Sequence, residues 1–174
     1  MNTEEIFQIL KNEFPDEVFE LQNNPFDPVI LVDPKSVSRI SFFLRDTPGF
    51  EFDALMCLSG VDDANGEKKL SPEGSTVIIG GTLSVVYHLH SIKNNHKITI
   101  KVSTSREEPE VESVESVWKC ADWHEREAFD MFGIIFLHHP ELIRILMPYD
   151  WEAGFPLRKD YKNPEFYQGM KVPY

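Results

Sequence analysis

The sequence predicts an α+β domain, in which a mostly antiparallel sheet has helices packed on one side and is followed by an extended C-terminal tail. Three observations favour this fold class. Helical periodicity appears twice in the first 50 residues and again before residue 133, a strong hairpin pattern lies in the middle of the chain, and periodicity is lost after residue 146. We therefore divide the chain into a domain over residues 1–146 and a partner-binding tail over residues 147–174.

The N-terminal segment predicts a helix followed by two short strands. Residues 3–14 carry apolar side chains at helical spacing, with Thr3 as the expected N-cap and Pro15 as the end of the helix. The runs over residues 18–21 and 29–32 are rich in β-branched and aromatic residues, which is typical of strands.

A second helix and a third strand follow. The Asp-Pro pair at residues 33–34 is expected to open the helix, and the Pro-Gly pair at residues 48–49 closes it. Residues 52–60 predict a strand, and the polar stretch over residues 62–69 predicts a solvated loop. The acids of that stretch lack the spacing and the closing glutamate of a calcium loop.

The clearest strands lie over residues 82–91 and 97–104, joined by an Asn-Asn turn. Apolar residues share one face of the first strand, and His88 and His90 share the other. These two histidines and His96 are candidate metal ligands, but a polar strand face explains them more simply.

A third helix is predicted over residues 113–132, and it places Glu125 within an apolar stripe. A carboxylate there needs a partner, so we expect a buried pair with Arg144 or Arg158. The spacing from Asp122 to Glu125 equally fits a capping box, in which the helix begins at Asp122 and Glu125 ties down its first turn.

The other face of this helix carries charged residues and a tryptophan. Asp122, Arg126 and Asp130 are spaced four residues apart, which is typical of a solvated ladder of ion pairs. Glu127 lies on the same face. Trp123 does not fit a purely solvated face, so we expect it either to lie beneath the C-terminal segment or to anchor a partner.

No catalytic residue, metal site or cofactor site is expected in this chain. The His-Glu pair that begins an HExxH motif lacks the second histidine, and no glycine-rich phosphate loop is present. Two cysteines are too few for the four thiolates that an iron–sulfur cluster usually takes. A net charge of −12 excludes nucleic acid as a partner. No apolar run has the length of a membrane span, and the N-terminal residues have no character of an export or import signal.

The tail and the eight residues before it have an unusual composition. Residues 139–174 contain five prolines and seven aromatic residues, and their five acids balance five bases while the rest of the chain is acidic. Frequent prolines exclude a helix or a central strand, whereas so many aromatic residues are unlike a disordered tail. From about Asp150 onward we expect the tail to be ordered mainly by a partner, with Arg158 contacting a partner carboxylate.

The stretch over residues 117–161 resembles the signature of the 30 kDa subunit, also called the C-type subunit, of the proton-pumping NADH:quinone oxidoreductase, respiratory complex I. Two blocks in the same order carry the resemblance. The first runs Glu125-Arg126-Glu127, Asp130-Met131-Phe132-Gly133, His139-Pro140 and Arg144-Ile145-Leu146, and the second is Asp150-Trp151, Gly154 and Pro156-Leu157-Arg158-Lys159-Asp160-Tyr161.

The resemblance implies a cofactor-free structural subunit of the hydrophilic arm, peripheral to the cytoplasmic side of the inner membrane. Its implied partners are a quinone-site subunit of the D type and iron–sulfur subunits of the B and I types, which with other subunits bind NADH, FMN, the clusters and quinone. The implied structural or interface residues are Trp123, Glu125, Arg126, Glu127, Asp130, His139, Arg144, Trp151, Arg158, Lys159 and Asp160.

Two alternatives stay open at this point. The first is the equivalent subunit of a membrane-bound hydrogenase or of a ferredoxin- or F420-type quinone reductase. The second is a free-standing metal-dependent enzyme that uses the histidines, which metal analysis and activity without partners would reveal.

Overall fold

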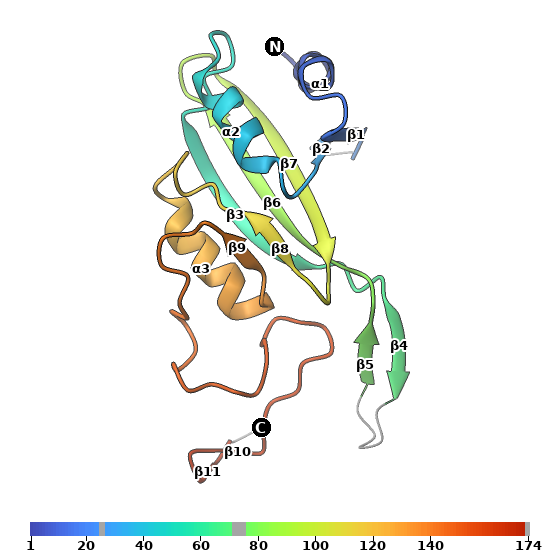
Figure 1. Cartoon of the computed structure of the whole chain (residues 1–174), viewed down its shortest axis with the longest axis vertical. Coiled ribbons are helices and arrows are strands. Elements are labelled where there is room, and N and C mark those ends of the chain that lie inside the picture. The colour runs from blue at the N-terminus through green and yellow to red at the C-terminus, as the bar shows by residue number, and fades with distance from the viewer. Residues whose placement is uncertain (25–26, 71–75, 173–174) are drawn as a thin grey trace.

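A five-stranded sheet forms the centre of the computed structural model, which describes residues 1–24, 27–70 and 76–172 (Figure 1). The helices of these residues pack on one face of the sheet and share its hydrophobic core. The helices are α1 (Thr3–Glu13), α2 (Val37–Asp46) and α3 (Ala121–Phe132), and the strands of the sheet are β1 (Val18–Gln22), β2 (Val29–Val32), β3 (Ala54–Asp62), β6 (Thr82–Ser91) and β7 (His96–Ser105).

The strands are ordered β1-β2-β7-β6-β3, and the sheet is mostly antiparallel. The predicted hairpin is present, because β6 and β7 pair without interruption from Thr82 opposite Ser105 to Ser91 opposite His96. Within this five-stranded sheet, the pairing of β2 with β7 is parallel and the other three are antiparallel. The predicted α+β class, with a mostly antiparallel sheet and helices on one side, is therefore confirmed.

Side chains alternate between the two faces of β6, as strand geometry requires. Leu83, Val85, Tyr87 and Leu89 are buried beneath the helices. On the opposite face the ring Nδ1 of His88 lies 3.0 Å from the Thr99 hydroxyl oxygen. The sheet therefore has one apolar face, covered by helices, and one polar face.

Both N-terminal helices begin at residues other than those predicted. Asn2 rather than Thr3 caps α1, because its side chain accepts the Glu5 N–H while the Glu5 carboxylate accepts the Asn2 N–H. Helix α2 begins at Val37 rather than at residues 33–34. The Asp33 carboxylate accepts the N–H of residue 35, and this turn delays the start of the helix.

The predicted polar loop over residues 62–69 is only partly a loop. Strand β4 (Glu67–Leu70) pairs antiparallel with β5 (Thr76–Ile79), and this two-stranded hairpin projects from the end of the main sheet (Figure 1). Its side chains are exposed apart from Ile78. The amphipathic pattern that reveals a buried strand is therefore absent from β4, which explains why the sequence predicts a loop there.

The segment before α3 is not helical, so the prediction of one helix over residues 113–132 is wrong. Strand β8 (Glu110–Glu112) pairs in parallel with β9 (Ile135–Leu137), and turns connect β8 to Ala121. Helix α3 ends at Gly133, whose φ of +75° is left-handed. A side chain there would also collide with the Phe155 ring, since its Cβ would lie 2.5 Å from that ring.

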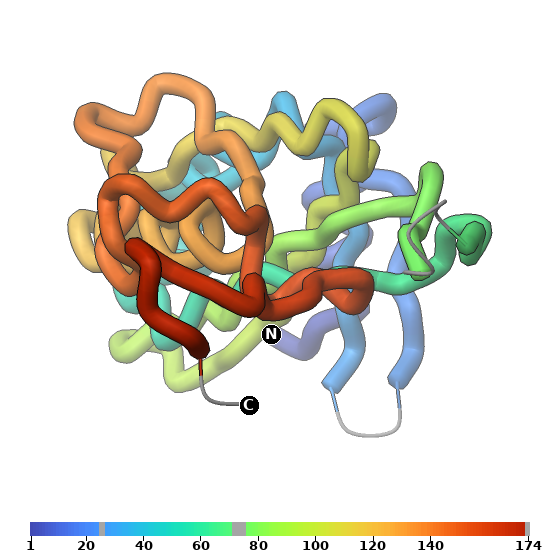
Figure 2. The backbone as a smooth tube through the Cα atoms, turned by 90° about the horizontal axis from the view of Figure 1, so that it is seen from below, coloured from blue at the N-terminus to red at the C-terminus, as the bar shows by residue number. Residues whose placement is uncertain are grey.

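The tail leaves β9 and passes beneath α3 toward the β4–β5 hairpin, as the view from below shows (Figure 2). It contains little regular structure before a small hairpin of β10 (Phe166–Tyr167) and β11 (Met170–Lys171). The last two residues of the predicted tail, 173–174, lie outside the described residues. The tail is thus a long extended segment that follows the surface of its own domain.

Candidate functional site

The residues of the signature lie on α3 and on the segment that returns beneath it. Glu125, Arg126 and Asp130 are buried, although the sequence places Arg126 and Asp130 on a charged face. Glu125 bonds to the loop before the helix, whereas Arg126 and Asp130 bond to the segment after it. Of the predicted ladder only the Asp122–Arg126 pair forms; the ladder is not solvated, and Asp130 pairs with Arg144 instead.

Glu125 holds the loop that precedes its own helix. Its carboxylate accepts the Ser113 hydroxyl at 2.6 Å and the Val114 N–H at 2.7 Å. Neither Arg144 nor Arg158 bonds to it, so the predicted ion pair is wrong. The predicted capping box is wrong as well, because Glu125 bonds to residues before the helix and not to Asp122.

This environment makes the Glu125 carboxyl group an unusually weak acid. Burial raises its pKa to about 7, the hydrogen bonds from Ser113 and Val114 oppose that rise, and the nearby negative charges of Glu115 and Asp122 add to it. A pKa near neutrality means that the protonated form is populated at the pH of a cell.

His139 lies buried between Glu125 and the first turn of α3. Its Nε2 is 3.2 Å from the nearer carboxylate oxygen of Asp122 and 3.9 Å from that of Glu125. Its Nδ1 accepts the Glu141 N–H at 3.1 Å, so the neutral ring carries its hydrogen on Nε2. The imidazole therefore ties the segment after β9 to the start of α3.

Arg126 links three parts of the site. Its guanidinium donates to Asp122 at 2.7 Å, one helical turn earlier, and to Glu141 at 3.2 Å in the returning segment. It also lies 5.4 Å from the centre of the Trp123 ring. The guanidinium is thus bound to groups of its own chain. The Trp123 side chain, by contrast, remains largely exposed at the surface.

Asp130 is the most heavily bonded side chain of the site. One carboxylate oxygen accepts the backbone N–H groups of Ile145, Leu146 and Met147 at 2.7–3.0 Å, and the other accepts Arg144 at 2.8 Å. Burial alone would raise the pKa of Asp130, but these four donors together hold it below its usual value. Asp130 therefore fixes the point at which the tail begins.

Arg158, Lys159 and Asp160 dock the middle of the tail on the domain. Arg158 donates to the Phe132 carbonyl at 2.7 Å, and its guanidinium lies 4.6 Å from the centre of the Phe155 ring. The Lys159 N–H donates to Asp62 at 2.8 Å. Arg158 therefore docks the tail on its own domain through its Nε, and the contact with a partner carboxylate stays a prediction.

A buried ion network completes this docking, and two of its members, Arg106 and Asp62, were not predicted from the sequence. Arg106 lies between Asp62 and Asp160 and donates to both, at 2.7 Å and 2.5 Å. Asp160 also accepts the Ile78 N–H, which links the tail to the β4–β5 hairpin. Burial alone would raise the pKa of Asp62, but Arg106 and two backbone N–H groups hold it below its usual value.

Substituting Asp160 by asparagine is expected to loosen the tail without unfolding the domain. Arg106 keeps Asp62 as its counter-charge, so we expect a loss of about 1 kcal/mol in the free energy of unfolding. Amide hydrogen exchange at Lys159 and Ile78 should become about five to ten times faster, because both donors depend on this network. The exposed Glu165, changed to glutamine, is the control. Unchanged exchange in the Asp160 variant would contradict the assigned role.

Other candidate residues remain at the surface. The Trp123 side chain is 63% exposed, so it does not lie beneath the tail. Glu127 is exposed and forms no hydrogen bond or ion pair within the described residues. Trp151 packs against Tyr167 in the tail, with ring centres 5.2 Å apart.

The three histidines proposed as metal ligands do not form a cluster. His96 faces the core, where its Nε2 lies 3.1 Å from the Phe50 carbonyl, whereas His88 lies on the polar face of the sheet. Among the described residues, no group of three or more His, Cys, Asp or Glu side chains is arranged to hold a metal ion. A search of the same residues finds no helix with the length and apolar character to cross a membrane.

Comparison with known proteins matches the chain to one family. The family model described as the 30 kDa subunit of respiratory-chain NADH dehydrogenase covers residues 30–167. The NADH-quinone oxidoreductase C-type subunit of Chloroherpeton thalassium is 44% identical over 97% of this chain, which spans 64% of that relative. The corresponding protein of Chlorobium phaeobacteroides is 42% identical over 97% of this chain and 93% of the relative.

Solved structures show the same fold at lower identity. A trypsin-resistant fragment of Nqo5 (residues 1–134) superposes with a TM-score of 0.62 at 21% identity, covering 82% of this chain and all of the fragment. A chain of a membrane-bound sulfane sulfur reductase, an archaeal respiratory membrane complex, gives a TM-score of 0.58 at 18% identity, covering 91% of this chain and 85% of that one. The match to the family model and the identity to the curated relatives agree with the signature on α3 and the tail. The chain belongs to the family of the 30 kDa subunit of respiratory-chain NADH dehydrogenase, the C-type subunit of its bacterial relatives.

Proposed function

We propose that this chain is a cofactor-free structural subunit of the peripheral arm of an NADH:quinone oxidoreductase. In this role it positions the subunits that carry electrons from NADH through iron–sulfur clusters to quinone, a transfer coupled to proton translocation. The observation that supports the proposal is that the polar and the apolar residues of α3 and the tail make different contacts. The buried polar residues of the signature bond within the chain, while aromatic and apolar side chains remain on its surface.

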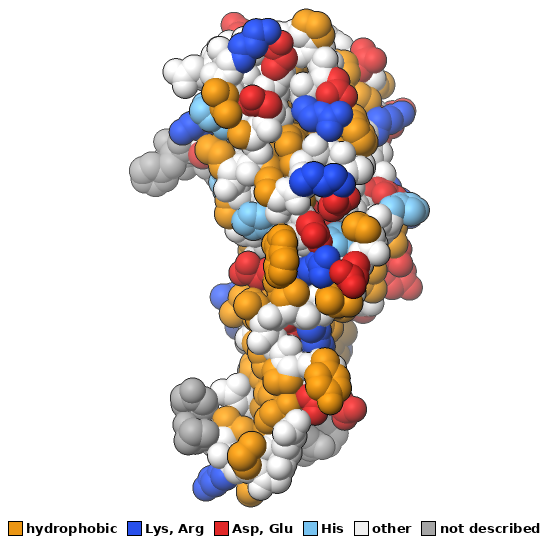
Figure 3. Space-filling model, turned by 90° about the vertical axis from the view of Figure 1, so that its left-hand side faces the viewer, with side chains coloured by type: hydrophobic (Ala, Val, Ile, Leu, Met, Phe, Trp, Pro, Cys, Tyr) orange, Lys and Arg blue, Asp and Glu red, His pale blue; other side chains and the backbone are white. Residues whose placement is uncertain are grey.

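Exposed apolar side chains follow α3 and the tail, although others lie elsewhere on the surface. In the space-filling view, hydrophobic side chains lie over the face that carries α3 and continue down over the tail (Figure 3). Apolar side chains that cluster at a surface mark sites of protein association. The exposed apolar residues of α3 and the following segment are Trp123, Ile135, Ile143, Leu146, Tyr149, Leu157, Phe166 and Met170.

The cofactors of the complex are assigned to its other subunits. Cys57 and Cys120 are the two cysteines of the chain, and an iron–sulfur cluster usually takes four. We therefore assign NADH, FMN, the clusters and quinone to partner subunits. The proposed neighbours are a quinone-site subunit of the D type and iron–sulfur subunits of the B and I types, on the cytoplasmic side of the membrane.

The proposal is tested by purifying the chain, tagged at its N-terminus, from its native cells in mild detergent and identifying what accompanies it by mass spectrometry. Co-purification with NADH-binding, iron–sulfur and quinone-site subunits is the expected result. A hydrogenase or another donor module in their place would assign the chain to a related membrane complex. Recovery of a lone chain with bound metal would overturn the structural role.

Replacing Trp123 by alanine is expected to lower the yield of partner subunits in this purification by about tenfold, because exposed tryptophans are frequent hot spots of association. The folded chain itself should be little affected, since the side chain is 63% exposed. The matched control is Ile92→Ala, because Ile92 is 65% exposed and directly follows β6 in the turn to β7, at the opposite end of the sheet from the tail (Figure 1). Equal yields from the two variants would remove Trp123 from the interface.

A further inference from the structure

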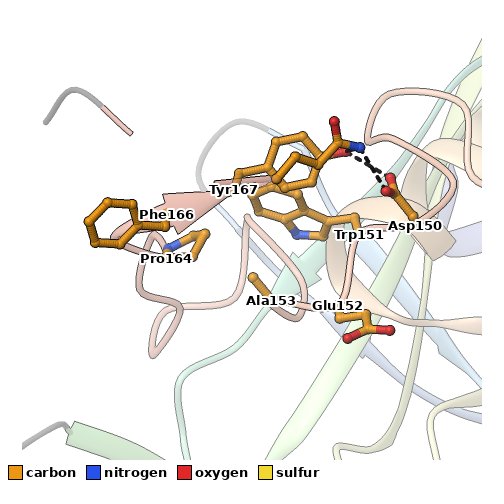
Figure 4. A pocket seen from close by; sticks show the side chains of 8 residues that line it. Asp150, Trp151, Glu152, Ala153, Pro164, Phe166 and Tyr167 are labelled. Atoms are coloured by element: carbon orange, nitrogen blue, oxygen red, sulfur yellow. Dashed lines mark hydrogen bonds between the residues drawn. The ribbon is translucent and has the colours of Figure 1, made fainter. Parts of the chain in front are cut away.

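The tail contains a cleft of about 560 Å³ that no part of the proposed function explains. Two short stretches of the tail form it, residues 150–153 and Pro164 with residues 166–168, while Glu165 is not part of its lining (Figure 4). Figure 4 shows the rings of Trp151, Phe166 and Tyr167 around this space, with the carboxylates of Asp150 and Glu152 at its edges. The cleft thus combines aromatic faces with acidic groups.

The small hairpin at the end of the tail creates this arrangement. Gln168 and Gly169 connect β10 to β11 with φ values of 47° and 78°, and two left-handed residues are what a type I′ hairpin turn requires. The turn brings Tyr167 against Trp151, with their ring planes inclined by 49°. Asp150 then locks the pair, because its carboxylate accepts the Tyr167 hydroxyl at 2.7 Å and the Gln168 amide at 2.8 Å.

The electrostatics of the cleft favour a positive group. Its lining contains no lysine, arginine or histidine. The hydrogen bonds from Tyr167 and Gln168 lower the pKa of Asp150, so this group is ionised at neutral pH. Glu152 forms no ion pair within the part of the chain that the structure describes. Aromatic faces attract cations through their ring quadrupole, and here two carboxylates add to that attraction.

We propose that this cleft receives an arginine side chain presented by an adjoining protein subunit, an inference that rests on the proposed role in a complex. A planar guanidinium can stack on Trp151 or Tyr167 while donating to the Glu152 carboxylate, which a lysine ammonium does less well. A protein rather than a free small cation is the occupant because the apolar surface extends beyond the cleft. Tyr149 is 95% exposed, and Phe166 and Met170 are exposed on the same tail.

The first test uses the full chain labelled with ¹⁵N and the peptide acetyl-Gly-Arg-Gly-amide. The peptide should shift the Trp151 indole N–H resonance and saturate at millimolar concentration. The same peptide with citrulline has nearly the same shape without the charge, and we expect it to bind at least about fivefold more weakly. Equal binding of both peptides, or no shift with either, would overturn the proposal. Neither result requires an assembled complex, so failure here leaves the proposed function standing.

Two variants test the assignment of the carboxylate. Glu152→Gln should weaken the arginine peptide about three- to tenfold, because it removes one charge at the edge of the cleft. Glu165→Gln removes an equal charge from the same tail outside this cleft and should leave binding unchanged. Equal effects of the two variants would mean that the peptide responds to the net charge of the tail alone, which would overturn the assignment.

The source of the arginine is tested in the assembled complex. A photo-reactive benzoyl-phenylalanine at Ala153, which lines the cleft, should cross-link to an arginine-containing peptide of a neighbouring subunit. Cross-links only to a small molecule, or to a subunit segment without arginine, would overturn the proposed occupant.

Discussion

Replacing Asp130 by asparagine is expected to lower the free energy of unfolding by about 3–5 kcal/mol, the usual loss when one member of a buried ion pair is removed. The substitution leaves the Arg144 guanidinium without its counter-charge. It also replaces a carboxylate that receives three backbone N–H groups by an amide with a single carbonyl acceptor. Urea denaturation near neutral pH, followed by tryptophan fluorescence, measures the change.

The control and a double variant separate this local effect from the loss of a negative charge. Asp16→Asn removes an equal charge from an exposed position and should change stability by less than about 0.5 kcal/mol. Adding Arg144→Met to the Asp130 variant removes the unpaired cation, so the double variant should lose less than the sum of the single losses, by about 1–2 kcal/mol. A loss below about 1 kcal/mol for Asp130→Asn would show that the tail reorganises around other acceptors.

The architecture could be predicted because its signals are local. The alternation along β6 and β7 has a period of two over ten residues each, and the apolar stripes of α1 and α2 have a helical period. Each pattern is contained in one continuous segment. Helix starts were predicted less well, because Asn2 and Asp33 bond to backbone groups within three residues and so shift the first turn.

The contacts of the site could not be predicted because they join distant segments. Arg106 meets Asp62 and Asp160, which lie 44 and 54 residues away in the sequence. The sequence shows a buried carboxylate at Glu125 from its place in an apolar stripe, but its partners lie 11 and 12 residues earlier, in a segment predicted to be helical. Because residues 113–120 form turns and irregular backbone after β8, a serine hydroxyl and a backbone N–H replace the expected arginine.

The same contacts predict that the pH dependence of stability has a component due to Glu125. In the folded state its pKa is raised to about 7, whereas in the unfolded chain it returns to about 4.5. Below about pH 4.5 both states are protonated, and this group favours neither state. As pH rises to about 7 the unfolded state releases its proton first, so the free energy of unfolding falls, by about 3 kcal/mol in total for this displacement of the pKa.

Glu125→Gln isolates this component, because glutamine does not titrate and its amide can still accept from Val114 while donating to the Ser113 hydroxyl oxygen. The stability of the natural chain relative to this variant should fall by about 3 kcal/mol between about pH 4.5 and pH 8, measured by urea denaturation at each pH. Glu127→Gln is the matched control, because Glu127 is exposed on the same helix two residues later. Its curve should run parallel to that of the natural chain. If the Glu125 variant also ran parallel, the buried carboxyl would be ionised throughout this pH range, which would contradict its raised pKa.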